Sequence, residues 1–346
     1  MAERPSNVLV LSGVRNGRRC GVYDYSGQLG EAIGSVGGNV EVVNVADWSL
    51  RSTLRLAARL FRHKGVVHAQ FPSQSMSQRA APYIVLAAAL SAKRVVTFHE
   101  FSRMTWRGKA LALPSLLLAR RIIATHKGEA EAISGTFPFV KHKVCCVPIG
   151  SNIPVARSSA ERTVDVCFFG MIGDNPQVRG FLDIVRRAGL AASAVLMGHA
   201  KMADPRTAGI VDEARALGVT LALDLPSDEV AAMLANSKVA VLPYEDGISE
   251  RRGSALAAMA NGALVVTTPP QSGDPRDFNG LCLMAADLAK LAETTRRALA
   301  HYDEHADIVR NARRYAGLRS WDRIAAEHVR LYRGQAPRAR YQPATT

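Results

Sequence analysis

The sequence predicts an α/β protein made of two domains, each with a doubly wound parallel sheet. Three observations support this prediction. The chain has 346 residues, of which 48% are hydrophobic, and this is enough for two folded domains of ordinary size. Short runs rich in valine and leucine alternate with helical or irregular segments, as they do in parallel βα units. A segment rich in Ser, Pro and Ala, residues 149–162, separates two strand-rich blocks and is typical of an interdomain linker.

The first block contains six predicted strands, at residues 8–12, 40–44, 65–69, 94–98, 122–125 and 143–147. The loop after the first strand, GVRNGRRCG, leads into a helix expected to start near residues 23–26. Gly21 would let the backbone approach a ligand, and Arg15, Arg18 and Arg19 would bring charge to it. The alternative is an exposed arginine loop. Dinucleotide or ATP binding is disfavoured here, because the loop has neither G-x-G-x-x-G nor a Walker lysine pattern.

Two histidines stand at predicted strand ends of this block. His68 belongs to HAQFPS, and His99 follows the next strand in TFHEF. We expect both imidazoles to emerge at the carboxyl edge of the sheet, where open α/β sheets bind ligands. The alternative for His99 is a structural imidazole held by Glu100 or by a loop carbonyl.

Residues 104–121, MTWRGKALALPSLLLARR, combine Trp106 and several leucines with five flanking cations. Such a segment can lie in the headgroup region of a bilayer. It can equally be the inner face of a helix packed on its sheet, and Pro114 is expected to interrupt that helix.

The second block repeats the pattern, with predicted strands at residues 164–170, 194–198, 219–223, 239–243 and 264–267. Its most informative stretch is 239–268, in which a strand, a turn, a small-residue helix and a second strand follow one another. The helix is expected from Gly253 to Met259 and should stop at Gly262.

The turn of this stretch, between Tyr244 and Ser254, predicts a diphosphate site. It gathers acids, hydroxyls, glycines and the pair Arg251–Arg252 between the carboxyl end of a strand and the amino end of a helix. Free N–H groups and the helix dipole favour an anion there, and an arginine fork adds bidentate hydrogen bonds to phosphate oxygens. The alternative is that Ser249 caps a helix beginning at Glu250 and that both arginines lie on a solvated face, paired with Glu245 or Glu250.

This stretch resembles the donor-site motif of glycosyltransferase family 4 and its relatives. The matching residues are Asp246, Gly247, Ser249, Arg251, Arg252, Gly253, Ser254 and residues 265–268. The common motif also has two glutamates seven residues apart, and the second of them cannot be carried over. The chain has alanine at both 257 and 258, where the ribose-binding glutamate would stand. The first glutamate maps to either Asp246 or Ser249.

Other segments resemble the same family. The residues Cys20, Gly21, Val22, Asp24, Tyr25 and Ser26 match its opening loop, and His99 matches a histidine that lies beside the donor sugar. A later segment of the family matches at Phe168, Phe169, Gly170 and Gly180, and Arg179 stands there in place of a phosphate-binding lysine. The following strand matches at Gly198 and His199. A crossover loop matches at Gly150 and Ser151.

The resemblance implies the GT-B fold, in which two Rossmann-like domains face each other across a cleft. The implied organisation is an acceptor-side domain at residues 1–150, a linker at 151–162, a donor-binding domain at 163–318 and a helix at 319–333 that returns to the first domain. Residues 334–346 are expected to be disordered.

The implied activity is a transfer of a hexose-type sugar from a nucleoside diphosphate sugar to a saccharide or lipid-linked acceptor in bacterial polysaccharide or glycoconjugate synthesis. The donor is a substrate, and neither a cofactor nor a metal is expected, because the sequence has no Asp-x-Asp pair. Arg252, helped by Arg251 and Arg179, would then stabilise the leaving diphosphate. The enzyme is expected to retain configuration, with His99 orienting the sugar; if it inverts, Asp24 or Glu100 could be the base.

Charge adds a further expectation about partners. Residues 1–150 contain 20 Lys and Arg against 8 Asp and Glu, a balance of +12 within the total of +14. This favours anionic partners, and the low, scattered aromatic content argues against nucleic acid. We expect a cytoplasmic protein that contacts the inner face of the membrane. The alternatives are an epimerase or hydrolase of nucleotide sugars on the same fold, or a basic protein without activity that binds membrane or nucleic acid.

Overall fold

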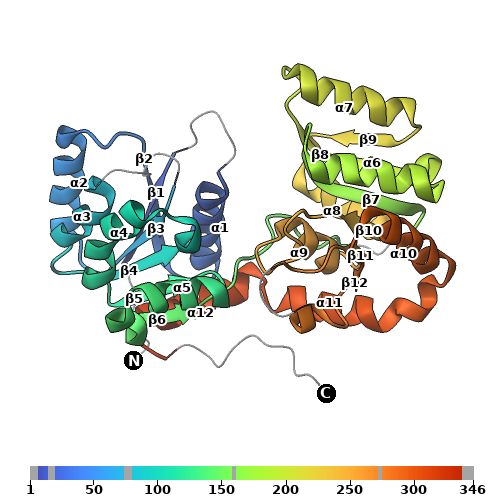
Figure 1. The fold of residues 1–346 in the computed structure, drawn as a ribbon. Helices are drawn as coiled ribbons and strands as arrows, with labels where there is room; N and C mark the ends of the chain where they lie inside the picture. Colours follow the sequence, from blue (N-terminus) through green and yellow to red (C-terminus); the bar gives the residue numbers. More distant parts are fainter. Residues whose placement is uncertain (1–6, 15–19, 74–79, 158–160, 272–274, 337–346) are drawn as a thin grey trace. The chain divides into compact units, whose positions relative to one another are not determined.

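The computed structural model describes residues 7–14, 20–73, 80–157, 161–271 and 275–336. The chain divides into two compact units (Figure 1). Unit 1 comprises residues 1–149 and 319–346, and unit 2 comprises residues 150–318. The loop arginines 15, 18 and 19 and the last ten residues of the tail lie outside the described residues.

Unit 1 is built on a six-stranded parallel sheet with the order β2-β1-β3-β4-β5-β6. The strands are β1 (Asn7–Gly13), β2 (Asn39–Val45), β3 (Val66–Phe71), β4 (Lys93–Phe98), β5 (Arg121–Ala124) and β6 (Val144–Cys146). The six strands predicted from the valine-rich runs are thereby confirmed, with ends that differ by no more than two residues. Runs of this composition form central parallel strands because both of their faces are buried.

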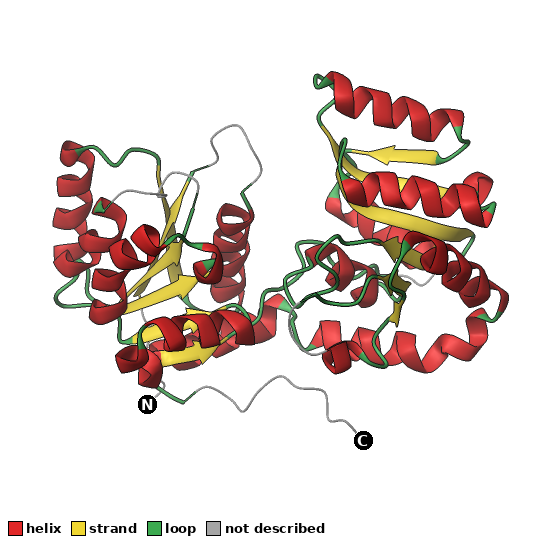
Figure 2. Ribbon diagram, viewed as in Figure 1, coloured by secondary structure: helices red, strands yellow, loops and turns green. Residues whose placement is uncertain are grey.

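Helices cover both faces of this sheet (Figure 2). On one face α1 (Gly21–Ser35) packs against α12 (Trp321–Tyr332), so the C-terminal helix belongs to unit 1. The other face carries α2 (Leu50–Arg62), α3 (Ala81–Ile84), α4 (Trp106–Leu118) and α5 (Lys127–Thr136), with the short 3₁₀ helices η1 (Val85–Ala88), η2 (Phe101–Arg103) and η3 (Pro138–Lys143) in their connections. Each helix layer closes its own hydrophobic core against the sheet.

Pro114 does not interrupt its helix, contrary to the prediction. Helix α4 starts after Thr105, whose side chain accepts a hydrogen bond from Gly108 N, and it continues past Pro114 to Leu118. A proline in a helix interior removes one backbone hydrogen bond. Ser115 and Leu116, which follow it, are completely buried against the sheet, and this packing holds the last turn in place.

Unit 2 is built on a second six-stranded parallel sheet, with the order β12-β11-β10-β7-β8-β9. Its strands are β7 (Val164–Ile172), β8 (Ala194–Ala200), β9 (Thr220–Leu223), β10 (Ser237–Leu242), β11 (Leu264–Thr267) and β12 (Leu283–Met284). The five predicted strands are confirmed. Strand β12 was not predicted from the sequence, because two residues are too short a run to show periodicity.

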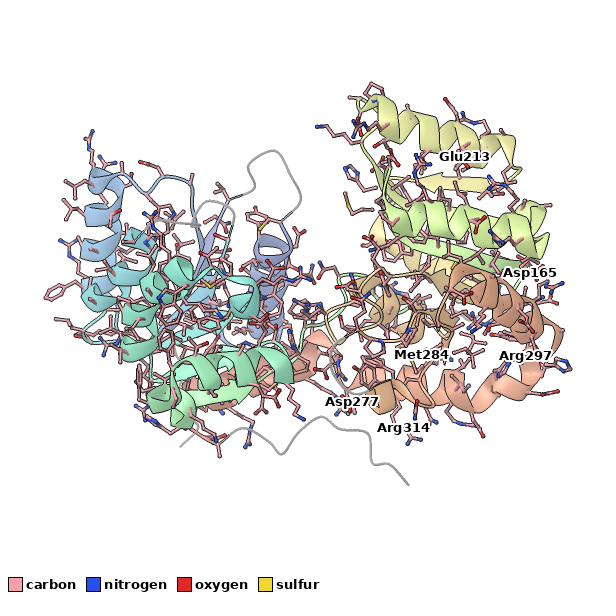
Figure 3. All side chains as sticks on the ribbon, in the orientation of Figure 1. Asp165, Glu213, Asp277, Met284, Arg297 and Arg314 are labelled. Atoms are coloured by element: carbon pink, nitrogen blue, oxygen red, sulfur yellow. The ribbon has the colours of Figure 1, made fainter. Side chains whose placement is uncertain are left out.

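The helices of unit 2 fall into packed groups. They are α6 (Pro176–Ala188), α7 (Pro205–Ala216), α8 (Ser227–Asn236), α9 (Gly253–Ala260), α10 (Leu288–Ala300) and α11 (Ala306–Gly317), with η4 (Ala191–Ser193), η5 (Pro275–Phe278) and η6 (Tyr302–His305) between them. Helix α6 packs on α10, and α9 packs on both α8 and α11. Figure 3 shows the side chains that fill these layers. Among the described residues, no helix is long and apolar enough to cross a bilayer.

The segment expected to be a linker is fixed to unit 2 by Asn261, which follows α9. The side chain of Asn261 accepts a hydrogen bond from Ala156 N (2.8 Å) and donates to the carbonyl oxygens of Pro154 and Ala257 (both 3.0 Å). Arg162 adds hydrogen bonds to the carbonyls of Ser237 and Asn261. Backbone N–H and C=O groups of this segment, which lie outside any helix or strand, therefore find their hydrogen-bond partners within unit 2.

We predict that Asn261→Ala lowers the thermal midpoint of unit 2. Asn261 is only 1% exposed, and the substitution leaves partly buried backbone groups of residues 154 and 156 without their partner. A fully buried group left unpaired costs about 1–3 kcal/mol of unfolding free energy, and a partly buried one costs less. Scanning calorimetry of the variant measures the loss. Asn279→Ala, at an exposed position of the same unit, is the control and should melt like the wild type.

Candidate functional site

The turn between β10 and α9, residues 243–252, lies against the chain that follows β11. Ile248 N donates to Thr268 O (3.0 Å), and the Gln271 side chain donates to Glu245 O (2.6 Å). Gly247 has φ of +75°, and a Cβ added there would meet Pro269 O at 1.9 Å. Only glycine fits this close approach, so the sequence fixes the path of the turn at Gly247.

Arg252 is the centre of the turn. It occupies the position just before α9, and its guanidinium carbon lies 4.2 Å from the ring centre of Tyr244. Its Nε donates to Gly247 O (3.3 Å), and its terminal nitrogen forms an ion pair with Asp246. The side chain is 21% exposed. The turn therefore holds a charged guanidinium, stacked on an aromatic face, at the amino end of a helix.

Tyr244 supports both Arg252 and the start of α9. Its ring is buried, and its hydroxyl lies 2.7 Å from the Ser254 hydroxyl in the first turn of the helix. Burial raises the pKa of Tyr244 to about 12, so the hydroxyl keeps its proton at neutral pH. This tyrosine was not identified from the sequence, because a tyrosine after a buried strand is most often part of the core.

The alternative in which Ser249 caps a helix from Glu250 is wrong. Helix α9 begins at Gly253. Gly253 N donates to Arg251 O (3.0 Å) and Arg252 N donates to Ser249 O (3.1 Å), so these residues form a tight turn and not a helical one. Arg251 and Ser249 are half-buried in that turn.

Two other predicted ligand-binding glycines meet inside β7 and β8, each two residues before the end of its strand. Gly170 and Gly198 pair in register across these strands. Gly198 has φ of +150°, and a Cβ added there would lie 1.7 Å from Gly170 O. The two strands can therefore approach only with glycine at 198, and Gly198 is buried between them.

Arg179 lies on the first turn of α6, where its neighbour Gly180 packs against Pro243 at the start of the β10–α9 turn. Its guanidinium is 57% exposed and forms an ion pair with Asp174, which lies just before α6. The hydrogen bond from Arg179 lowers the pKa of Asp174. Arg179 is thus a second cation near the β10–α9 turn, exposed and paired with Asp174.

In unit 1, His99 is the first residue after β4, as predicted, and it is 8% exposed. Its Nε2 lies 2.9 Å from Gln70 Oε1, and the ring of Tyr25 meets it edge-on at 4.8 Å. An amide oxygen only accepts, so Nε2 carries the proton and donates. Burial lowers the pKa of His99 to about 3, and the imidazole is neutral at pH 7.

His68 does not emerge at the carboxyl edge, contrary to the prediction. Strand β3 continues to Phe71, so His68 is an interior residue of the strand and is fully buried. Its Nδ1 lies 2.7 Å from the Tyr332 hydroxyl and its Nε2 2.7 Å from the Thr97 hydroxyl. Gln70, two residues further along β3, links His68 to His99. His68 therefore fastens the C-terminal helix to the sheet.

The remaining predicted residues of unit 1 lie around this network. Gly21 begins α1, and Asp24 is half-buried in the first turn of that helix. Glu100 is exposed and lies 3.8 Å from Arg103. Of the described residues, no group of three His, Cys, Asp or Glu side chains is arranged to hold a metal ion.

Gln70 and Tyr25 were not predicted from the sequence as partners of His99. Both lie inside segments that the sequence motifs did indicate, HAQFPS and the opening of α1. The two-residue spacing from His68 places Gln70 on the same face of β3 as that histidine. The hydroxyl of Tyr25 is buried and has no hydrogen-bond partner within the described part of the chain.

We predict that unit 1 loses stability as the pH falls from about 6.5 toward 4. Burial lowers the pKa of His68 well below its usual value, that of His99 to about 3 and that of His328 to about 4. The unfolded chain binds these protons near pH 6.5 and the folded chain does not, so each histidine contributes about 1.4 kcal/mol of destabilisation per pH unit in that window. His328→Leu should flatten the dependence of the thermal midpoint on pH, and exposed His301→Leu should not. An equal slope in both variants would contradict the prediction.

Comparisons with known proteins agree with the two-unit architecture. No protein-family model matches the chain. A glycogen synthase from Alkalilimnicola ehrlichii is 40% identical over 86 residues, which is 25% of this chain and 18% of that enzyme. The chain thus spans less than a fifth of the length of this curated relative.

Solved structures match over nearly the whole chain. Sucrose-phosphate synthase from Thermosynechococcus elongatus has a TM-score of 0.68 at 16% identity, over 95% of this chain and 98% of that one. Anabaena HepE in complex with UDP has a TM-score of 0.65 at 13% identity, over 95% and 100%. A Listeria monocytogenes protein assigned as a UDP-N-acetylglucosamine 2-epimerase has a TM-score of 0.62 at 12% identity, over 96% and 98%. With its two six-stranded parallel sheets, the chain therefore has the GT-B fold.

Proposed function

We propose that this protein is a glycosyltransferase that moves a hexose from a nucleoside diphosphate sugar to a saccharide or lipid-linked acceptor. The observation that carries the proposal is the placement of Arg252 before α9, stacked on Tyr244 and held by Asp246. HepE, which has the same fold, has been solved with UDP and with UDP-glucose. A guanidinium next to a helix amino end suits the diphosphate of such a donor.

The proposed reaction needs positive charge at the leaving group. The bond between the anomeric carbon and the phosphate oxygen breaks, and its electron pair goes to the diphosphate. The acceptor oxygen forms the new bond and releases its proton to the leaving phosphate. Arg252, with Arg251 and Arg179, neutralises the charge that grows on the diphosphate, and no metal is needed for this step.

Asp246 gives this arrangement an exchangeable partner. In the free protein its carboxylate pairs with Arg252, which keeps the guanidinium in place without a ligand. A diphosphate brings more negative charge and two phosphate groups for the same fork, so donor binding would replace Asp246 at Arg252. The stacking on Tyr244 does not involve the N–H groups and can persist through the exchange.

His99 is proposed to orient the donor sugar. It is neutral, and since its Nε2–H is engaged by Gln70, its Nδ1 is the acceptor left for a sugar hydroxyl. We propose that configuration is retained, from the resemblance of the β10–α9 turn to family 4. Asp24 or Glu100 would act as a base only if the reaction inverts. The anomeric coupling in the proton NMR spectrum of fresh product distinguishes the two outcomes.

We predict that Arg252→Ala lowers kcat for sugar transfer by about 10²–10³-fold, because one stabilising contact to a developing anion is lost. Arg252→Lys should fall between this variant and the wild type, since lysine keeps the charge but not the planar fork. A coupled assay that monitors release of the nucleoside diphosphate measures kcat of both variants.

Arg314→Ala is the matched control, because Arg314 is an exposed arginine on α11 of the same unit (Figure 3). It should transfer sugar at the wild-type rate. If Arg252→Ala also transfers at the wild-type rate, the proposed role of this turn is wrong. A thermal-shift screen with UDP, GDP, ADP and their sugars identifies the donor, since a ligand that binds the folded state raises the melting temperature.

A second candidate is a nucleotide-sugar epimerase or hydrolase. The likeness to the Listeria protein favours it, because that protein shares the fold and is assigned as an epimerase. The two reactions differ in their need for an acceptor. Turnover of the donor that does not depend on any acceptor, with an epimer or a free sugar as product, would replace the transferase proposal. Synthesis of a bacterial polysaccharide or glycoconjugate at the inner face of the cell membrane remains the proposed setting.

A further inference from the structure

Helix α2 in unit 1 has three distinct sides. Leu56 and Leu60 are buried against the sheet. A second side carries Leu50, Leu54 and Phe61, which are 76%, 60% and 60% exposed. At 3.6 residues per turn these three side chains project within about 40° of one another. They form a continuous apolar stripe on the outside of the helix, where an ordinary surface helix carries polar residues.

The third side of α2 is basic. Arg51, Arg55, Arg59 and Arg62 occupy the sector next to the apolar stripe, and all four are exposed. Helix α2 contains no acidic residue, and Arg59 forms an ion pair with Glu41 of β2. Between α2 and the end of β2 lies a hollow of about 310 Å³ lined by Arg55 and Arg59 together with Asp47. We call Leu50, Leu54, Phe61 and these four arginines the α2 surface.

Neighbouring elements of the same layer also expose large apolar side chains. Helix α2 packs on η1, and η1 packs on α4, on the same side of the unit 1 sheet (Figure 1). This layer exposes further large apolar side chains: Ile84 at 51%, Leu90 at 65%, Trp106 at 70% and Leu117 at 52%. Exposed apolar residues gathered in one layer, with basic residues beside them, indicate a partner that is both apolar and anionic.

We infer that the α2 surface docks on the headgroup region of an anionic lipid bilayer. The leucines and Phe61 enter the boundary between headgroups and acyl chains, and the arginines contact lipid phosphates. A nucleic acid would satisfy the arginines but not the apolar stripe, and residues 1–150 carry the charge of +12 that an anionic surface attracts. The inference depends on this surface alone and holds whether or not the protein transfers sugar.

Co-sedimentation of the full chain with phosphatidylcholine vesicles, with or without phosphatidylglycerol, tests the inference. We expect binding that requires the anionic lipid and weakens at high salt. The double variant Arg51→Gln, Arg55→Gln removes two charges, and since each basic residue near the surface is worth about a fivefold change in partitioning, it should bind roughly 25-fold less. The triple variant Leu50→Ser, Leu54→Ser, Phe61→Ser should keep the salt dependence but lose most of the binding.

A matched control removes two exposed arginines from unit 2, Arg297→Gln with Arg314→Gln (Figure 3). It has the same net charge as the α2 double variant and should bind vesicles like the wild type. Equal losses in both double variants would mean non-specific charge attraction and would overturn the inference, as would a wild-type chain that ignores the vesicles. If the triple variant fails to fold, the two arginine variants still decide.

Two other outcomes also contradict membrane docking. If sedimentation velocity showed that the wild type is a dimer and the triple variant a monomer, the surface would join two copies of the chain. Binding of RNA that depends on Arg51 and Arg55 but not on Leu50, Leu54 and Phe61 would make it a nucleic-acid surface. Thermal shift with nucleotide sugars in solution is run on the same variants, so that a failure of vesicle binding is distinguished from a failure of the proposed function.

Discussion

Parallel pairing of strands that are buried on both faces is the constraint on which both units depend. In such a sheet the strand interior must be apolar or fully hydrogen-bonded, and polar chemistry is confined to the strand ends. Strand β10 is buried along its valine-rich length, and the charged turn begins only beyond Leu242. His99 follows β4 in the same way. The sheet thus restricts ligand-binding groups to the strand ends, whatever residue types they are.

At the end of β10, the same constraint produces a turn that is organised before a ligand arrives. Gly247 lets the turn approach residues 269–270, and Tyr244 supplies an aromatic surface for Arg252. Asp246 neutralises the guanidinium in the free protein. An arginine held in this way loses little conformational freedom on binding an anion, and this is the physical basis of the proposal that the turn binds a diphosphate.

In unit 1 the buried polar groups of β3 and the residue that follows β4 satisfy one another. His68, Gln70 and His99 form a chain of hydrogen bonds that ends at Tyr332 of α12, so the C-terminal helix is tied to the residue proposed to meet the sugar. Low exposure keeps the imidazoles neutral, because a charge there would lose its hydration, and at His99 the attraction of Glu129 does not offset that loss. The helix layer on the other face of the sheet differs: the outer side of α2 carries exposed apolar and basic residues, and no element among the described residues of unit 1 covers it.

The sequence by itself determined the fold class, eleven of the twelve strands and the positions of the β10–α9 turn and of His99. These follow from local signals: valine-rich runs, glycines at tight approaches and the order of strand, turn and helix. Only the tertiary structure decided that His68 is a structural residue, that Arg252 pairs with Asp246 over Tyr244, and that Leu50, Leu54 and Phe61 remain exposed. His68 and Tyr332 are 264 residues apart, and no local pattern encodes a contact at that separation. Which side of a helix is covered depends likewise on what the rest of the chain packs against it.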